Sequence, residues 1–130
     1  MQQIITELEQ YLNIIQTFDK DTAQDAQALH EYLISLTNFM ARANLIMAQY
    51  QKKFREEKKA AYLNLVASQT ASQKYFSASQ GKDFVDSQCA EVGYVFDLAE
   101  RLSRCCSHTI SAMITVVSSL KSERQFANYQ

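Results

Sequence analysis

Residues 85–120 read VDSQCAEVGYVFDLAERLSRCCSHTISAMITVVSSL, with an apolar or small side chain at every third or fourth position. The steps alternate between four and three residues for five heptads, which is the period of an α-helix that buries one seam. A second apolar stripe runs beside this seam, so the helix presents a face wide enough for more than one neighbour. The seam consists of Val85, Cys89, Val92, Phe96, Ala99, Ser103, Cys106, Ile110, Met113, Val117 and Leu120.

The same spacing occurs twice earlier in the chain. After Phe54 the longer pattern shifts by one extra four-residue step, a stutter that locally relaxes a coiled-coil supercoil. These patterns predict three helices, at about residues 2–18, 22–68 and 82–123. The first seam consists of Ile4, Leu8, Tyr11, Ile15 and Phe18, and the second of Leu29, Leu33, Leu36, Met40, Ala43, Met47, Tyr50, Phe54, Lys58, Ala61 and Leu65.

Turn-forming residues are scarce, because the 130 residues include no proline and two glycines. β-Sandwiches, barrels and glycine-rich phosphate loops need more of these residues, so the composition argues against them. At 47% apolar and 21% charged, the chain also lacks the composition of a disordered protein. We therefore expect one all-α domain over residues 1–130. Its predicted architecture is a long antiparallel helical hairpin with a shorter N-terminal helix, similar to a coiled coil or helix bundle.

The serine- and glutamine-rich residues 68–82 are expected to connect the two long helices. A turn centred near residue 76 would place two residues opposite each other when their numbers add to about 152. The first helix, roughly 25 Å long, would then cover only the open end of the hairpin, near residues 22–38 and 112–128. A stripe left exposed in the middle favours a homo-oligomer, with a two-fold dimer as the simplest form. The expected interface residues are Val95, Leu98, Leu102 and Cys105.

Groups that could support catalysis or bind a metal do not converge in this sequence. Cys105 and His108 share a helical face, but zinc needs three or four ligands and no third ligand is expected near them. The two histidines are too far apart to serve one nucleophile together. We therefore expect no enzymatic activity, no metal and no cofactor. The cysteines, which are Cys89, Cys105 and Cys106, are expected to be reduced and structural.

Basic residues are concentrated in the middle of the chain, although the whole chain has a net charge of −1. Residues 48–82 hold seven bases and two acids, whereas residues 1–47 hold two bases and six acids. Aromatic residues are interleaved with the bases, so segment 50–62 predicts either a single-stranded nucleic-acid site or a surface that is solvated or binds protein. The expected contact residues are Lys52, Lys53, Arg55, Lys58 and Lys59, with Arg101 and Arg104 expected opposite residues 51 and 48.

Residues 53–67 and the stretches KDFVDSQC (82–89), AERL (99–102) and SSLKSERQFAN (118–128) resemble small uncharacterised helical proteins of bacteriophages and prophages. The resemblance covers about residues 40–130 of the chain. It implies a protein expressed in the cytoplasm of a bacterial host, from a gene close to genes for DNA replication or recombination. It implies no functional residue.

The first twenty residues contain Glu7 and Glu9 and lack a basic start before an apolar core, so no signal peptide is expected. No apolar run approaches the ~20 residues that span a bilayer, so no membrane partner is expected. We expect a cytoplasmic, non-catalytic interaction or scaffold protein that binds another macromolecule, as a recombination or replication accessory or as an inhibitor of a host protein. Direct binding of single-stranded nucleic acid through residues 50–62 is the alternative.

Overall fold

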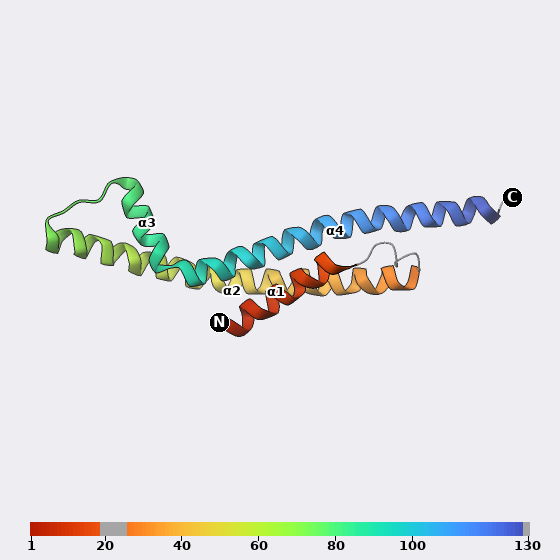
Figure 1. Cartoon of the computed structure of the whole chain (residues 1–130), viewed down its shortest axis with the longest axis horizontal. Helices are drawn as coiled ribbons and strands as arrows, with labels where there is room; N and C mark the ends of the chain where they lie inside the picture. Colours follow the sequence, from red (N-terminus) through yellow and green to blue (C-terminus); the bar gives the residue numbers. More distant parts are fainter. Residues whose placement is uncertain (19–25, 129–130) are drawn as a thin grey trace.

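The computed structural model describes residues 1–18 and 26–128. These residues form four helices and no strand: α1 (Gln2–Thr17), α2 (Ala26–Ser72), α3 (Ala78–Gln88) and α4 (Ala90–Asn128). The long helices α2 and α4 run antiparallel, and the short α1 packs against them (Figure 1). The predicted all-α hairpin with a shorter N-terminal helix is therefore confirmed. The predicted start of the second helix, residue 22, lies outside the described residues.

Residues 73–77 join α2 to α3, a shorter connection than the predicted 68–82. After Ser72, Gln73 takes a left-handed conformation (φ 55°) that ends α2. The Ser77 hydroxyl then accepts a hydrogen bond from the Gln80 backbone N–H, and the Gln80 side chain accepts one from the Ser77 N–H. This capping box satisfies two backbone donors that would otherwise lack partners, so α3 begins at Ala78 and not near residue 82.

The predicted single helix 82–123 is wrong, because two helices meet at Cys89. The Cys89 backbone (φ −106°, ψ 11°) leaves helical geometry, and its N–H is shared between the carbonyls of Asp86 and Val85, each at 3.2 Å. α3 therefore turns away from the axis of α4 at the far end of the hairpin (Figure 1). The bend lets Val85 and Cys89 pack with Ala61 and Leu65 of α2 in a small second core.

The register of α2 against α4 also differs from the prediction. The predicted turn placed residue 108 opposite Asn44, whereas Asn44 accepts a hydrogen bond from the Ser103 hydroxyl (2.8 Å). The connection is shorter than predicted and α3 leaves the helix pair at its bend, so the two long helices meet in a different register. In this register the Phe54 ring lies against Gly93, where an added Cβ would come within 3.0 Å of the ring carbon Cε2.

α1 lies along the middle of the hairpin, although its length predicted a position at the open end. At its C-terminal end Phe18 stacks on Tyr32 of α2, with ring centroids 3.6 Å apart. Further along, Glu9 accepts a hydrogen bond from the Tyr94 hydroxyl of α4 (3.2 Å). Tyr32 lies within the predicted range 22–38, but Tyr94 lies outside the predicted range 112–128, so α1 extends further toward the connection than expected.

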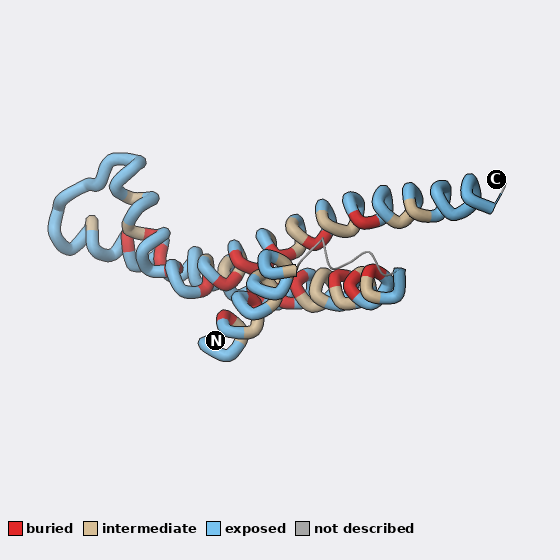
Figure 2. The backbone as a smooth tube through the Cα atoms, turned by 45° about the vertical axis from the view of Figure 1, so that its right-hand side comes forward, coloured by how far each residue is buried: buried red, intermediate tan, exposed pale blue. Residues whose placement is uncertain are grey.

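The main core is completed by α1. Figure 2 shows that buried residues lie where the helices face one another. Leu8 of α1 belongs to the same cluster as Val95 and Leu102 of α4, and all three are 0% exposed. Leu98 is also buried in this cluster, and Cys105 is half-buried. The expectation that these four α4 residues form an exposed stripe is therefore wrong, because α1 supplies the neighbour that they need.

Leu8→Ala should lower the free energy of unfolding by roughly 3 kcal/mol, because it leaves a cavity under α1. The matched control is Leu63→Ala, since Leu63 is 63% exposed, and it should change stability by about 0.5 kcal/mol or less. Urea denaturation followed by circular dichroism measures both. Equal effects of the two substitutions would contradict the placement of α1.

The ion pair between Glu7 and Arg42 should make α1 docking depend on pH. The Arg42 guanidinium bonds the Glu7 carboxylate at 2.9 Å and lowers the pKa of Glu7, although partial burial opposes the shift. A lowered folded-state pKa means that this stabilisation is present above pH 4.5 and is lost as the pH falls. Glu7→Gln should therefore cost about 0.5 kcal/mol at neutral pH and almost nothing near pH 3. Urea midpoints at the two pH values measure the difference, and a cost independent of pH would contradict the assignment.

Candidate functional site

The basic residues of α2 fall on two sides of the helix. Lys52, Arg55 and Lys59 recur at steps of three and four, and Tyr62 and Val66 continue the same spacing. All five side chains are exposed, with Tyr62 at 62% and Val66 at 56%. Residues with this spacing share one helical face. We call these five residues the outer stripe.

Lys53 lies away from the outer stripe, whereas Lys58 borders it, three residues after Arg55 and four before Tyr62. The Lys53 ammonium sits 4.9 Å from the centre of the Tyr50 ring, and the Lys58 ammonium 5.0 Å from the centre of the Phe54 ring. Lys53 also shares a helical side with Glu57, which lies four residues further on. These two lysines therefore have partners within α2 that the bases of the outer stripe lack.

The bases of the outer stripe form no ion pair with any described residue. Within residues 1–18 and 26–128, the ion pairs are Glu7–Arg42 and Glu100–Arg104. Glu56 borders the stripe and follows Lys52 by four residues, yet the two side chains do not pair. The positive charge of the stripe is thus accessible to solvent or to a ligand.

Arg101 and Arg104 are not brought together with this stripe. Arg104 follows Ser103, whose hydroxyl bonds Asn44, so it lies at the level of Asn44. Lys52 is eight residues further along α2, which is about 12 Å. Arg104 is also paired with Glu100 on its own helix. The predicted joint basic surface is therefore wrong, because it depended on the register that the structure corrects.

A hollow between α2 and α3 lies at the end of the outer stripe. Lys58 and Tyr62 line it from α2, Phe76 from the connection, and Lys82 and Asp86 from α3. The buried side chains Leu65 and Val85 also line the hollow. Sequence reasoning missed this feature because it started α3 near residue 82, although the Ser77–Gln80 capping pattern was a readable signal.

Exposed aromatic rings surround this hollow. Tyr75 is 83% exposed, and Phe76 is 42% exposed although it stacks on Phe84 with ring centroids 6.0 Å apart. With Tyr62, three rings are accessible at this end of the molecule. Rings held in water beside lysines can stack on planar ligands and attract anionic ones.

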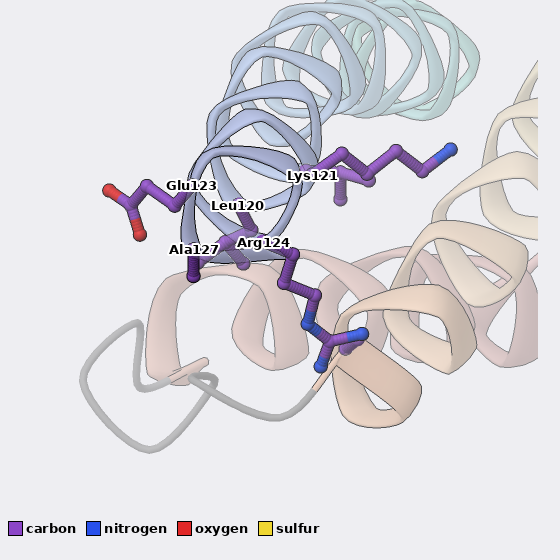
Figure 3. A pocket seen from close by; sticks show the side chains of 7 residues that line it. Leu120, Lys121, Glu123, Arg124 and Ala127 are labelled. Atoms are coloured by element: carbon purple, nitrogen blue, oxygen red, sulfur yellow. The ribbon is translucent and has the colours of Figure 1, made fainter. Parts of the chain in front are cut away.

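The open end of the hairpin has a different character. α4 continues past the first turn of α2 (Figure 1), and the space between them is lined by Ala26 of α2 and by Val117, Leu120 and Arg124 of α4. Figure 3 shows Arg124 reaching toward α2 while Glu123 points to the other side of α4. Apolar side chains remain exposed here, and these are Ile114 (54%), Val116 (41%) and Phe126 (68%).

The cysteines are poorly suited to nucleophilic chemistry. Burial raises the pKa of Cys106 to about 11, with a smaller contribution from Cys105, and burial also raises the pKa of Cys89. The thiolate is the reactive form, so these two side chains stay protonated at neutral pH. All three cysteines are free thiols in the structure.

Neither metal ligands nor membrane-spanning segments occur in the described parts of the chain. Residues 1–18 and 26–128 contain no group of three or more His, Cys, Asp or Glu side chains arranged to hold a metal ion. Across the same residues, none of the helices has the length and apolar character needed to cross a membrane.

Comparison of the chain with family models, curated proteins and solved structures found no match. The resemblance to phage-encoded helical proteins therefore stays a prediction.

The three thiols should react with an alkylating reagent at different rates. Cys105 is half-buried, whereas Cys89 is 1% and Cys106 0% exposed. In the native protein at about pH 8, one thiol should react quickly and two should react roughly 100-fold more slowly or slower still, since they need local opening. Cys105→Ala should remove the fast phase, and denaturant should expose every remaining thiol. Three equal native rates would contradict the burial described above.

Proposed function

We propose that this chain is a non-catalytic helical binding protein that joins to a second copy at its open end and holds another macromolecule on its distal arm. The open end comprises the start of α2 and residues 110–128. The distal arm comprises residues 50–88, which are the second half of α2, the connection and α3.

The observation that carries this proposal is the large surface of the isolated chain. A compact monomer of 14.9 kDa exposes about 7,000 Å², whereas this chain exposes 9240 Å². The excess on this one chain, about 2,200 Å², is larger than the roughly 600–1,000 Å² that each partner buries in a stable interface of standard size. Apolar side chains contribute to this surface at both ends of the hairpin. A surface of this size and composition is typical of a protein that works in a complex.

Charge favours the open end as the contact between copies. At the distal arm, self-association would bring the outer stripes together and place like charges face to face, which costs free energy. At the open end, Glu123 lies among Lys121 and Arg124, so acidic and basic groups are both available. The exposed Ile114 provides an apolar contact on one side of α4 and Val116 provides one on the opposite side, because residues two apart do not share a helical face. In a two-fold dimer, the same surface of both copies forms this contact.

The distal arm is then free to bind a partner. α3 and the second half of α2 lie at the opposite end of the hairpin from the C-terminal end of α4 (Figure 1). A dimer of this kind would hold two copies of the partner at its two outer ends. Scaffolding of this type suits a recombination or replication accessory of a phage in its bacterial host, the role that the sequence resemblance implies. The alternative role within this proposal is that the same arm binds and inhibits a host protein.

The absence of catalysis is supported by the chemistry of the side chains. The protonated thiols Cys89 and Cys106 lie in apolar cores. The hollow between α2 and α3 contains Asp86 and two lysines but no histidine. These groups can bind a ligand through charge, and they lack the paired base and nucleophile that covalent catalysis needs.

Light scattering at micromolar concentration should give twice the monomer mass of 14.9 kDa. The double variant Ile114→Glu/Val116→Glu should shift the protein toward monomer by placing charge in the contact, with the helicity retained because both side chains are 41% exposed or more. The matched control is Leu63→Glu/Val66→Glu, which changes two similar side chains on the distal arm and should leave the dimer intact. A wild-type monomer would overturn the dimer, and loss of the dimer in the control would move the contact to the distal arm.

A further inference from the structure

We infer that the distal arm binds single-stranded nucleic acid, with phosphates along the outer stripe and bases at the hollow between α2 and α3. This inference rests on the proposed function and names the partner of the same arm. The alternative occupant of the arm is an acidic protein surface.

The outer stripe fits a phosphate backbone. Lys52, Arg55 and Lys59 follow one another at about 4.5–6 Å along the helix axis, on one face. They form no ion pair with a described residue and carry no cation–π contact, so their donors are available. Lys53 and Lys58 differ from them in their contacts, because each lies over an aromatic ring of α2. The three stripe residues therefore form a short row of positive charge that a strand can follow.

Aromatic side chains lie where this row ends. Tyr62 is the next member of the outer stripe after Lys59, and it also lines the hollow. Phe76 lines the hollow from the connection, and the adjacent Tyr75 is 83% exposed. A base that leaves the stripe at Tyr62 therefore meets a second ring nearby. Stacking on such rings tolerates any base and requires bases that are not hidden in a duplex.

The hollow has a mixed charge, so it suits phosphates less well than the outer stripe does. Lys58 and Lys82 line the hollow, but Asp86 lines it as well and would repel a phosphate. The carboxylate can accept hydrogen bonds from the N–H groups of bases, including the ring N–H of thymine. Phosphates are therefore assigned to the outer stripe, which contains three bases and no acid and is bordered by Glu56.

A protein partner fits the stripe less well. Between Lys52 and Lys59 the stripe has no apolar position, so a docked helix would have to desolvate three charges in succession. The phosphates of a single strand stay partly hydrated when they pair with such a row, and the release of their counterions favours binding. Nucleic acid is therefore the partner that this arrangement favours.

The test is fluorescence anisotropy of a labelled oligothymidylate of about 30 nucleotides with the full-length protein. Binding should be measurable at about 50 mM salt and roughly 20-fold weaker at about 200 mM salt, as expected for three phosphate contacts on a single strand. A duplex of the same length should bind more weakly because its bases are hidden. No binding at the lower salt concentration would overturn the inference.

Two sets of variants locate the site. Lys52→Gln/Arg55→Gln/Lys59→Gln should reduce affinity at least tenfold and flatten the salt dependence. The matched control Lys53→Gln/Arg101→Gln/Arg104→Gln removes the same charge away from both the stripe and the open end, and it should reduce affinity less than threefold. Equal losses in both triple variants would mean that net charge alone attracts the strand, and they would overturn the site.

Aromatic variants separate nucleic acid from other acidic polymers. Tyr62→Ala/Phe76→Ala should weaken oligothymidylate roughly tenfold or more without changing the salt dependence, because stacking involves no counterion. Polyglutamate should compete poorly. Equal binding of polyglutamate, with no effect of the aromatic variant, would identify a surface for acidic proteins and overturn the inference.

The two proposals fail in different ways. A dimer by light scattering that does not bind oligothymidylate overturns the nucleic-acid assignment and leaves the scaffold function in place. A monomer that binds oligothymidylate only through the outer stripe overturns the joining of copies and leaves the nucleic-acid assignment in place.

Discussion

The burial of one apolar seam between α2 and α4 is the interaction on which the rest of this molecule depends. Two antiparallel helices can bury one stripe each, but α4 carries two adjacent stripes. Ala99 and Cys106 face α2, and Val95 and Leu102 need another neighbour. α1 supplies it, and its Leu8 is 0% exposed in the same cluster. Because α1 has 16 residues and α2 has 47, most of the hairpin still lacks a third helix. The exposed apolar residues at both ends follow from this difference in length.

Periodicity was sufficient to predict the helix pair and most of its core. Leu29, Leu36, Ala43 and Tyr50 were placed in the seam of α2, and all are buried. The break at Cys89 left no trace in this signal, because Val85, Cys89 and Val92 keep the same alternation of four and three residues through the bend. Heptad phase reports which side of a helix is buried, and it carries no information on whether the helix axis bends. Neither proline nor glycine occupies residue 89, so local composition gave no second signal.

The errors in the candidate site came from long-range geometry. Whether Arg104 lies beside Lys52 or at the level of Asn44 depends on the register of two helices that meet across a five-residue connection, and the seam pattern is compatible with several registers. The exposure of Leu98 likewise depended on where α1 docks, which its own seam does not specify. The shared face of the bases of the outer stripe can be predicted without knowing the register of α2 against α4, because it follows from their spacing on one helix. Their exposure on α2 was predicted correctly. Prediction of the hollow beside them would have required the position of α3.

The location of the basic run has a physical explanation in the stutter of α2. Phe54 is the contact between the main core and the second core, and the next buried residue of α2 is Ala61. Residues 55–60 are all exposed, so nearly two turns of α2 contribute no buried side chain. Gly93 reinforces this arrangement, because its missing Cβ lets the Phe54 ring fill the space alone.

Since these six positions pack against nothing, the fold permits any helix-forming residue there, including alanine or a balanced mixture of charges. Three of the six are basic and two are acidic, and Arg55 and Lys59 belong to the outer stripe. Folding does not require this charge, and a partner with negative charge gives it a role.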